Sequence, residues 1–272
     1  NLELKNDVNP IFIKPRPIPY ARKQKIEQEL DSMEKSGIIT KVEHSDWGTP
    51  ILAVDKPDGS VRICADYKVT VNKVIKDFNY PIPRIEDIYA QMNGGKLFCT
   101  LDLSKAYFHL EMDSESSMLQ ALSTHRGVYR VNRLMFGVKV APTKFQQFMD
   151  QVLQGIDGVQ CFFDDIIIQG STAQEVFKRL EQVLNKIKSY NLTLNREKCK
   201  FLEKSIEYLG HVINEHGLHK AKDKVNAILH AKRPENTKEL KSFLGLANYY
   251  NKFTPNLAAT LHPLNVLLRK NS

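Results

Sequence analysis

Two adjacent aspartates, Asp164 and Asp165, lie between two runs of strand-forming apolar residues in the stretch CFFDDIIIQG, residues 161–170. The stretch predicts a hairpin made of a strand, the aspartate pair and a second strand. Aspartate is a common turn residue, so one interpretation is a solvated turn. The flanks are too apolar for an ordinary exposed turn, and another isolated acid, Asp102, lies within the apolar segment CTLDL. Like charges beside a core need compensation, which constrains the fold around them.

Grouped carboxylates in a partly buried site are tolerated where a divalent cation neutralises them. Aspartate oxygens with open coordination positions suit magnesium, which keeps waters and binds substrate phosphates. Two such ions about 3.5–4 Å apart can activate an attacking oxygen and stabilise a leaving one. Asp102, Asp164 and Asp165 are therefore candidate metal ligands for phosphoryl chemistry. The sequence has no GxxxxGK[ST] phosphate loop, which argues against an NTPase of that class.

The remaining pattern is α+β, with a mixed core of strands and helices followed by an all-helical basic tail. Hairpins are predicted at ILAV-KPDGS-VRICADY and HRGVYRVNRL, short strands at LTLN, KCKFL and IEYLGHVI, and a largely extended segment at KLFCTLDLSKAYFHLEM. One helix is predicted from Ile26 to Met33, with Gly37 as its stop. Further helices are predicted at IEDIYAQM, APTKFQQFMDQVL and STAQEVFKRLEQVLNKIK. The last of these has an apolar stripe made of Val176, Leu180, Val183, Leu184 and Ile187. Capping boxes are predicted for Ser171 with Gln174 or Thr172 with Glu175, and for Asn236 with Glu239.

The last part of the chain is strongly basic. Residues 218–272 contain ten Lys or Arg and three Asp or Glu, so +7 of the total net charge of +8 lies there. A solvated, lysine-rich helical surface is one interpretation of this count. The other is a surface that follows the backbone of a polyanion.

The four cysteines form no CxxC pair, and no histidine spacing near them suggests zinc. Scattered cysteines with mostly apolar neighbours favour reduced, buried thiols over disulfides, and hence a cytosolic or nuclear setting. No run of 18 or more apolar residues is present, so neither a membrane span nor a membrane partner is expected. The charged start, NLELKNDVNP, shows no signal peptide, and the chain is expected to be part of something longer.

Five ordered motifs carry a resemblance to a known family. They are LDLSKAYFHL, LMFG with APTKFQQ, FFDD, LNREKCKF and YLGHV. In this order and spacing they resemble reverse transcriptases, and most of all those of gypsy-type long-terminal-repeat retrotransposons. KPRPIPY, DWGTPILAVDKPDGSVRICADYK and ELKSFLGLANYYNKF also look like that family, so the resemblance covers nearly the whole chain.

The resemblance implies a right-hand polymerase with fingers (1–79 and 112–141), palm (80–111 and 142–217) and thumb (218–272). The basic tail then becomes the thumb, which in the family packs against the primer–template backbone. Phosphate contacts of this kind give sequence-independent, salt-sensitive affinity, in agreement with the charge count. The implied activity is that of an RNA-directed DNA polymerase, which extends a primer on an RNA or DNA template with deoxynucleoside triphosphates.

The resemblance also assigns roles to single residues. By motif match, Asp102, Asp164 and Asp165 resemble the catalytic acids that hold two magnesium ions, for which manganese could substitute, and the backbone carbonyl of Leu103 could add a ligand. The other matches are the nucleotide-binding residues Lys56, Arg62, Lys105, Ala106, Tyr107 and Phe136, the primer grip Leu209, Gly210 and His211, and the template contact Lys68.

Each of these matches has a simpler interpretation when the motif is set aside. Lys56 and Arg62 flank the KPDGS turn and would be solvated hairpin charges. Tyr107, which in the family excludes a ribose 2′-hydroxyl, would be a core tyrosine. His211 would be a structural histidine on a strand.

Three positions depart from the family pattern. The family usually has proline where Met135 stands and often a smaller aliphatic residue where Phe163 stands, while Lys105 replaces a variable residue beside the triphosphate. Met135 bears on the backbone shape of the pocket, and Phe163 on the space at the primer terminus. Neither removes a metal ligand. The alternative function is a domesticated, non-catalytic nucleic-acid-binding protein, against which the presence of all three aspartates speaks.

A longer polyprotein with protease, ribonuclease H and integrase is the parent that the resemblance implies. The acidic motifs of a ribonuclease H are absent from these residues, so we expect no hydrolysis of the RNA strand by this chain. The expected location is the cytoplasm, in a virus-like particle, or the nucleus.

Overall fold

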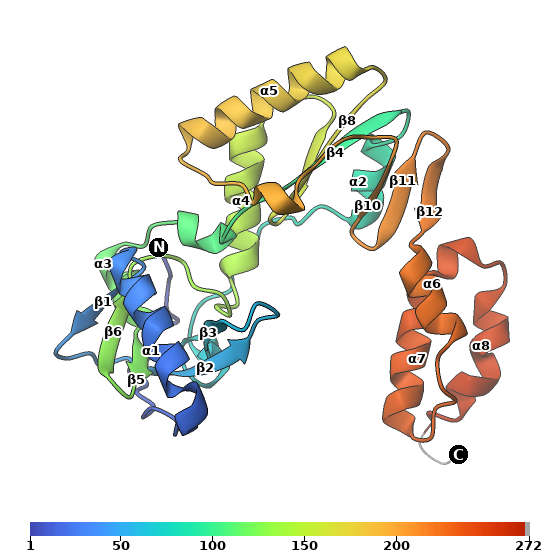
Figure 1. The fold of residues 1–272 in the computed structure, drawn as a ribbon. Helices are drawn as coiled ribbons and strands as arrows, with labels where there is room; N and C mark the ends of the chain where they lie inside the picture. Colours follow the sequence, from blue (N-terminus) through green and yellow to red (C-terminus); the bar gives the residue numbers. More distant parts are fainter. Residues whose placement is uncertain (270–272) are drawn as a thin grey trace. The chain divides into compact units, whose positions relative to one another are not determined.

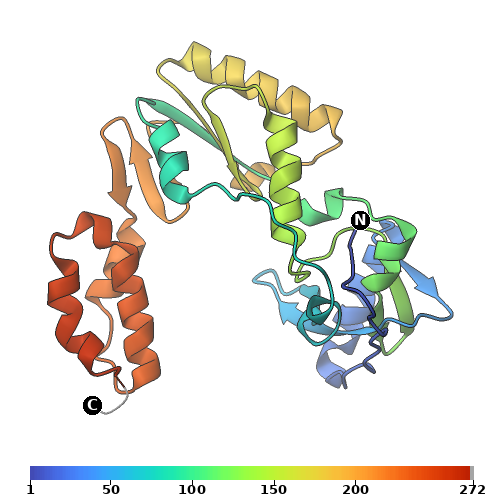
Figure 2. The same ribbon diagram turned by 180° about the vertical axis from the view of Figure 1, so that it is seen from behind.

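The computed structural model describes residues 1–269 and divides into two compact units (Figures 1 and 2). The first unit comprises Asn1–Pro83, Leu101–Ile166 and Arg179–Cys199, and the second comprises Arg84–Thr100, Ile167–Lys178 and Lys200–Ser272. Strands β4 (Leu97–Asp102) and β8 (Asp165–Gly170) and helix α5 (Ala173–Ser189) each run from one unit into the other.

A five-stranded sheet in the order β1-β6-β5-β2-β3 forms one part of the first unit. Its strands are β1 (Ile39–Val42), β2 (Thr49–Asp55), β3 (Val61–Ala65), β5 (Leu122–Thr124) and β6 (Gly127–Val131). Strands β2 and β5 pair in parallel, and the other neighbours pair antiparallel. Both predicted hairpins are confirmed. In the KPDGS turn, Asp58 Oδ1 accepts from the Ser60 amide at 2.9 Å, and Gly59 takes a φ of +80°, which glycine reaches without strain.

Helix α1 (Tyr20–Lys35) contacts β1 and β3 of this sheet, as the position of α1 in Figure 1 shows. Its buried residues are Ile26, Leu30 and Met33, the three that the helical spacing predicted. The helix ends where Gly37 takes a left-handed φ of +70°, and the Ile38 amide donates back to the Met33 carbonyl at 2.9 Å. The predicted stop and buried face are therefore confirmed, whereas the helix begins at Tyr20, before the predicted start at Ile26.

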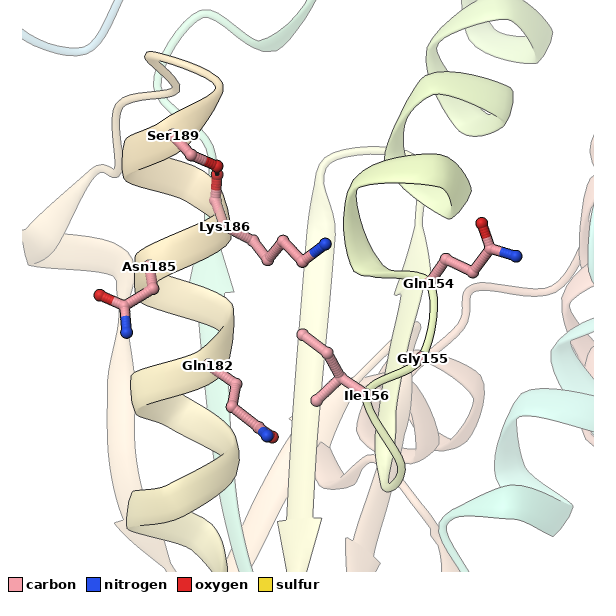
Figure 3. A pocket seen from close by; sticks show the side chains of 7 residues that line it. All are labelled: Gln154, Gly155, Ile156, Gln182, Asn185, Lys186 and Ser189. Atoms are coloured by element: carbon pink, nitrogen blue, oxygen red, sulfur yellow. Dashed lines mark hydrogen bonds between the residues drawn. The ribbon is translucent and has the colours of Figure 1, made fainter.

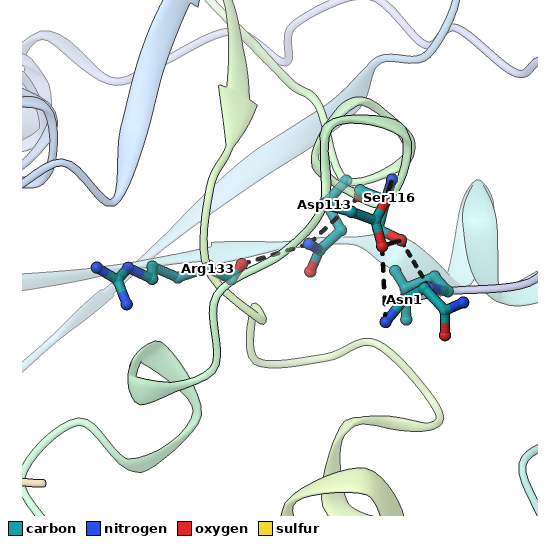
Figure 4. A network of polar contacts seen from close by, with 6 residues as sticks. Asn1, Asp113, Ser116 and Arg133 are labelled. Carbon is teal, nitrogen blue, oxygen red and sulfur yellow. Dashed lines mark hydrogen bonds and ion pairs between the residues drawn. The ribbon is translucent and has the colours of Figure 1, made fainter. Parts of the chain in front are cut away.

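Polar contacts tie the N-terminus to the segment that leads into the LMFG motif (Figure 4). Asp113 caps helix α3 (Ser114–Leu119) by accepting from the Ser116 amide at 2.8 Å, and its other oxygen lies 3.6 Å from the N-terminal ammonium of Asn1. Gln120 follows α3, and its side-chain amide nitrogen Nε2 donates to the Arg133 carbonyl at 3.3 Å. These bonds hold the chain directly before Met135 in place.

A four-stranded sheet in the order β7-β8-β4-β9 includes the two strands that the units share. Its other strands are β7 (Val159–Phe162) and β9 (Lys200–Glu203), and helix α4 (Ala141–Leu153) contacts β7. Helix α4 covers the predicted segment and buries Phe145, Met149 and Val152.

Helix α5 begins at the predicted capping box. The Glu175 amide donates to Thr172 Oγ1 at 3.3 Å, and the Glu175 carboxylate accepts from the Ser171 amide at 2.8 Å. Val183 of the predicted stripe is buried, whereas Leu184, one position further round the helix, is 39% exposed. The inclusion of Leu184 in the core was therefore wrong, because it lies beyond the edge of the buried face.

The second unit holds a meander and a helical bundle in addition to its share of the four-stranded sheet (Figure 2). The elements are α2 (Ile85–Gln91), β10 (Ser205–Tyr208), β11 (His211–Asn214), β12 (Gly217–Lys220), α6 (Lys222–Leu229), α7 (Thr237–Tyr249) and α8 (Leu257–Val266). Leu240, Leu244 and Leu261 are buried in the core of the bundle. Asn236 caps α7 by accepting from the Glu239 amide at 2.9 Å, which confirms the second capping box.

Three predicted elements differ in the structure. The segment KLFCTLDLSKAYFHLEM does not stay extended, because Lys105 takes a left-handed φ of +52° and a 3-10 helix follows at Ala106–His109. LTLN contributes an isolated bridge at Leu194 instead of a strand. The basic tail is not all helical, since β12 pairs with β11 before α6 begins. The short elements not yet given are the 3-10 turns Tyr67–Val69, Val71–Lys73, Arg196–Lys198 and Asn251–Phe253.

All four cysteines are free thiols. Cys99 and Cys161 are buried, and Cys64 and Cys199 are partly buried. The prediction of unpaired thiols is confirmed. Along residues 1–269, every helix is too short or too polar to cross a membrane.

We predict that Leu30→Ala lowers the free energy of unfolding by about 2–5 kcal/mol, because Leu30 is fully buried under the sheet and the change leaves a cavity. Leu184→Ala is the matched control, and its effect should stay below about 1 kcal/mol because Leu184 is 39% exposed. Urea denaturation followed by circular dichroism measures both. Equal losses from the two variants would contradict the assigned core.

Candidate active site

The aspartate pair is presented by the hairpin between β7 and β8. The turn is Phe163–Asp164, and Asp165 is the first residue of β8, so the turn lies one residue earlier than the sequence predicted. Phe163 takes a left-handed φ of +56°. A residue with a side chain pays roughly 1–2 kcal/mol for this conformation, so neighbouring groups must stabilise the turn.

Gln146 of α4 binds this turn from the protein interior, where its side chain is completely buried. Its Oε1 accepts from the Phe163 amide at 2.7 Å, and its Nε2 donates to the Cys161 carbonyl at 3.0 Å. The same Nε2 donates to Asp150 Oδ1 at 2.8 Å. One buried amide group therefore fixes the backbone on both sides of Phe162, directly before the two aspartates in the chain.

Two further groups complete this network. The Tyr80 hydroxyl donates to the other oxygen of Asp150 at 2.7 Å, and this bond raises the pKa of Tyr80. The Cys161 thiol donates to the Phe163 carbonyl at 3.1 Å, and burial raises the pKa of Cys161 so that the thiol keeps its proton. The sequence analysis missed Gln146, Asp150 and Tyr80. For Gln146, the signal in the sequence was a polar residue between Phe145 and Met149, which are both buried on the same helix.

Asp102 lies at the end of β4, beside the aspartate turn. The amide of the next residue, Leu103, donates to the Asp164 carbonyl at 3.3 Å, and the Asn195 amide donates to the Asp102 carbonyl at 2.9 Å. The Asp102 carboxylate forms an ion pair with Lys198 Nζ at 3.3 Å and is 18% exposed. The fold thus brings together the backbone of all three predicted acids and of Leu103. Lys198, in the LNREKCKF motif, was not predicted as a partner.

The three acids also interact electrostatically. The pKa of Asp165 is raised to about 6, first by desolvation, then by the negative charges of Asp164 and Asp102, while Lys198 acts in the opposite direction. Asp165 is exposed at the surface, so solvent screens part of this repulsion. The excess of negative charge is what a cation would neutralise.

The residues fit divalent cations by chemistry, because carboxylate oxygens are hard ligands that suit magnesium. Within residues 1–269, however, no three His, Cys, Asp or Glu side chains are gathered closely enough to form a metal site as they stand. Lys198 pairs with one oxygen of the Asp102 carboxylate, Oδ2.

Two predicted nucleotide residues, Tyr107 and Phe136, lie against each other near the acids. Their ring centroids are 4.8 Å apart, and Tyr107 also meets Phe145 of α4 edge-on at 5.3 Å. Burial, and after it the charge of Asp164, raises the pKa of Tyr107. Tyr107 is therefore packed as a core tyrosine on one side and lies near the aspartates as well, so the two interpretations of this residue are compatible.

The residues next to this aromatic pair differ in exposure. Ala106 is buried and Lys105 is exposed at its left-handed position. Met135 is fully buried, and its amide donates to Gln120 Oε1 at 2.8 Å. A buried side-chain acceptor thus fixes the backbone of LMFG at the position where the family usually has proline. Phe163 packs its ring on Phe162 with centroids 4.5 Å apart.

Lys56, Arg62 and Lys68 lie in the first unit, as the three acids do. The backbone of Lys56 closes the KPDGS turn, because its carbonyl accepts from the Gly59 amide and its amide donates to the Ser60 carbonyl. Arg62 is exposed on β3, and Lys68 is exposed on a 3-10 turn. Their assignment to nucleotide and template remains a prediction.

The predicted primer grip is the turn between β10 and β11 in the second unit. Leu209 and Gly210 are its two central residues, with φ of +47° and +74°. His211 is buried, as its structural interpretation expected, with Nδ1 2.9 Å from the Tyr89 hydroxyl.

A cavity of about 510 Å³ lies elsewhere in the first unit, between the loop after α4 and helix α5 (Figure 3). Lys186, Gln182 and Asn185 line it from α5, and Gln154 and Ile156 line it from the loop. None of the predicted site residues lines this cavity. The cavity is therefore separate from the predicted nucleotide-binding residues.

The mixed α/β fold, with acids presented at one end of a four-stranded sheet, is that of a right-hand polymerase domain. A family profile described as "Reverse transcriptase (RNA-dependent DNA polymerase)" matches residues 54–213. This match covers more than half of the 272 residues, so the chain belongs to the reverse transcriptase family.

Among curated relatives, the transposon Tf2-7 polyprotein of Schizosaccharomyces pombe is 33% identical over 272 residues, which is 99% of this chain and 20% of the polyprotein. The chain thus spans about a fifth of the length of such relatives. Among solved structures, a foamy viral protease-reverse transcriptase in complex with double-stranded DNA matches with a TM-score of 0.90 and 28% identity, over 96% of this chain and 46% of that one. A complex of the foamy viral protein with an RNA/DNA hybrid matches with a TM-score of 0.86 and 27% identity, over 96% and 35%.

We predict that Asp165→Asn raises the melting temperature at pH 7.5 in the presence of a chelator. The folded pKa of about 6 lies above the ordinary value of 3.8, so the folded state binds the proton more tightly and loses stability as the pH rises between these values. The advantage of asparagine should therefore grow from pH 4 to pH 6 and level off above. Asp157→Asn, at an exposed loop aspartate, is the control. A pH-independent difference, or destabilisation at pH 7.5, would refute the assigned repulsion.

Proposed function

We propose that this chain is an RNA-directed DNA polymerase that extends a primer on an RNA or DNA template with deoxynucleoside triphosphates. The observation that carries the proposal is the presentation of Asp164 and Asp165 on a turn held by Gln146, next to Asp102, in a member of the reverse transcriptase family. An ordinary solvated turn has no need of a buried glutamine that fixes its backbone. The same grouping leaves a local excess of negative charge.

In this proposal Asp102, Asp164 and Asp165, with the carbonyl of Leu103, would hold two magnesium ions, for which manganese could substitute. Bound there, the ions supply neutralisation of phosphate charge and activation of the primer 3′-hydroxyl. The hydroxyl attacks the α-phosphate of the incoming nucleotide and pyrophosphate leaves. The contribution of the chain is positioning, because little covalent work falls to the protein.

Tyr107 selects the sugar in this proposal. Its ring is packed between Phe136 and Phe145, so it cannot turn aside to admit a ribose 2′-hydroxyl. Lys105 and Ala106 precede it and lie beside the triphosphate. Lys56 and Arg62 flank the KPDGS turn, from which they reach the triphosphate when the turn closes over it.

The basic C-terminal part is proposed to contact the primer–template backbone. Lys232, Arg233, Lys238 and Lys241 are all exposed there, and exposed lysines and arginines bind phosphates without sequence preference. The similarity to foamy viral complexes with double-stranded DNA and with an RNA/DNA hybrid supports this partner. We keep fingers, palm and thumb at the predicted boundaries, Lys68 as template contact, and a polyprotein parent, as parts of the same proposal.

The test is primer extension on a heteropolymeric RNA template with magnesium and deoxynucleotides, with Asp164→Asn as the variant. We predict extension by the native chain and a loss of at least about 10³-fold in the variant, because a metal ligand acts on the transition state. Binding of the RNA/DNA hybrid should persist in the variant. The control, Asp157→Asn, alters an exposed aspartate outside the site and should extend normally.

Tight hybrid binding with no extension by the native chain would overturn the proposal. It would favour the non-catalytic nucleic-acid-binding protein instead, and would direct attention to Met135 and Phe163. Full activity of Asp164→Asn would refute the assignment of the acids while leaving a polymerase.

A further inference from the structure

The turn between β10 and β11 has an unfavourable sequence for its backbone. Both central residues of a two-residue hairpin turn of this type take positive φ, which favours Asn-Gly. Here the first is Leu209, with φ of +47°, followed by Gly210 at +74°. The left-handed conformation costs leucine free energy, and its side chain can form no hydrogen bond to offset this cost, so other groups must hold the turn.

Three tyrosine hydroxyls lie within hydrogen-bond distance of its carbonyl oxygens. The Tyr249 hydroxyl, from the last residue of α7, donates to the Leu209 carbonyl at 2.7 Å. The hydroxyl of Tyr250, the residue that follows the helix, donates to the Gly210 carbonyl at 2.8 Å. From α2, the Tyr89 hydroxyl lies 3.1 Å from the Tyr208 carbonyl and 3.2 Å from that of Leu209. Three consecutive carbonyls are thus bound by side chains from two helices.

These bonds fix the orientation of whole peptide groups, not of single atoms. A peptide unit is planar with its N–H opposite to its C=O, so a bound carbonyl sets the direction of the following amide. The aromatic rings are themselves packed around the buried His211, whose ring centroid lies 5.2 Å from Tyr249, 5.4 Å from Tyr250 and 5.1 Å from Tyr89. The hydroxyls therefore act from a rigid base.

We propose that Tyr249 and Tyr250 are positioning residues for the primer terminus, through which helix α7 sets the geometry of the Leu209–Gly210 turn. The inference rests on the proposed function, since it takes this turn as the primer grip. It adds a direct link between the first long helix of the basic tail and the reacting end of the primer. Burial raises the pKa of Tyr89, Tyr249 and Tyr250, which keeps all three hydroxyls protonated as donors.

The test is the double variant Tyr249→Phe with Tyr250→Phe, which removes the two hydroxyls and keeps the ring packing around His211. Single-turnover incorporation of one deoxynucleotide gives a rate constant and an amplitude, and titrations give the affinity for primer–template and nucleotide. We expect the rate constant to fall about tenfold, because misplacement of the primer end by a fraction of an ångström slows the reaction. The amplitude and both affinities should change less than about twofold, and the melting temperature should stay close to that of the native chain.

Tyr20→Phe is the control, because Tyr20 is 94% exposed on α1, and it should leave the rate constant unchanged. A lower amplitude with an unchanged rate constant would mean that the hydroxyls only help the chain to fold, and would overturn the proposal. So would a rate constant equal to that of Tyr20→Phe. If the native chain incorporates no nucleotide at all, the proposed function itself fails, and this role fails with it.

Discussion

The hydrogen bonds of Gln146 are the interaction on which the proposed active site depends. A buried amide that lacked these partners would cost about 1–3 kcal/mol, so the side chain and the turn require each other. Gln146 binds the backbone on both sides of Phe162 and places Asp164 and Asp165 at the end of the sheet, while Asp150 and Tyr80 hold the glutamine in turn. The excess negative charge at the acids is tolerated because the interior fixes the backbone below them.

A strained turn bound by side chains of a neighbouring helix occurs at two places among the described residues. Phe163 and Leu209 both take left-handed backbone conformations that favour glycine, and in both places side chains from a neighbouring helix bind the turn. At Phe163 a glutamine binds the amide, and at Leu209 a tyrosine binds the carbonyl. Strained residues of this kind persist where the surroundings over-determine them, which is typical of functional sites. The two turns are the predicted metal site and the predicted primer grip, each within its own unit.

Local pattern was enough to predict most elements, because α1, α4 and the hairpins have apolar residues at a clear spacing and standard turn and cap residues. It failed at single residues for two different reasons. Lys105 ends the extended segment by taking a left-handed backbone conformation, and Leu184 lies just outside the buried face of its helix. The motif match named the acids, but the network around Gln146 and the ion pair of Lys198 join residues distant in sequence. Such contacts depend on the tertiary fold, which spacing alone does not determine.

The most direct measurement is single-turnover incorporation by Gln146→Met beside Gln147→Met. The two residues are neighbours on α4, and Gln147 is only partly buried. If the buried amide sets the position of the aspartates, Gln146→Met should lose about 10- to 100-fold in rate constant while hybrid binding and the folded state persist. Gln147→Met should match the native chain. Equal rates for the two folded variants would contradict the central role given to Gln146.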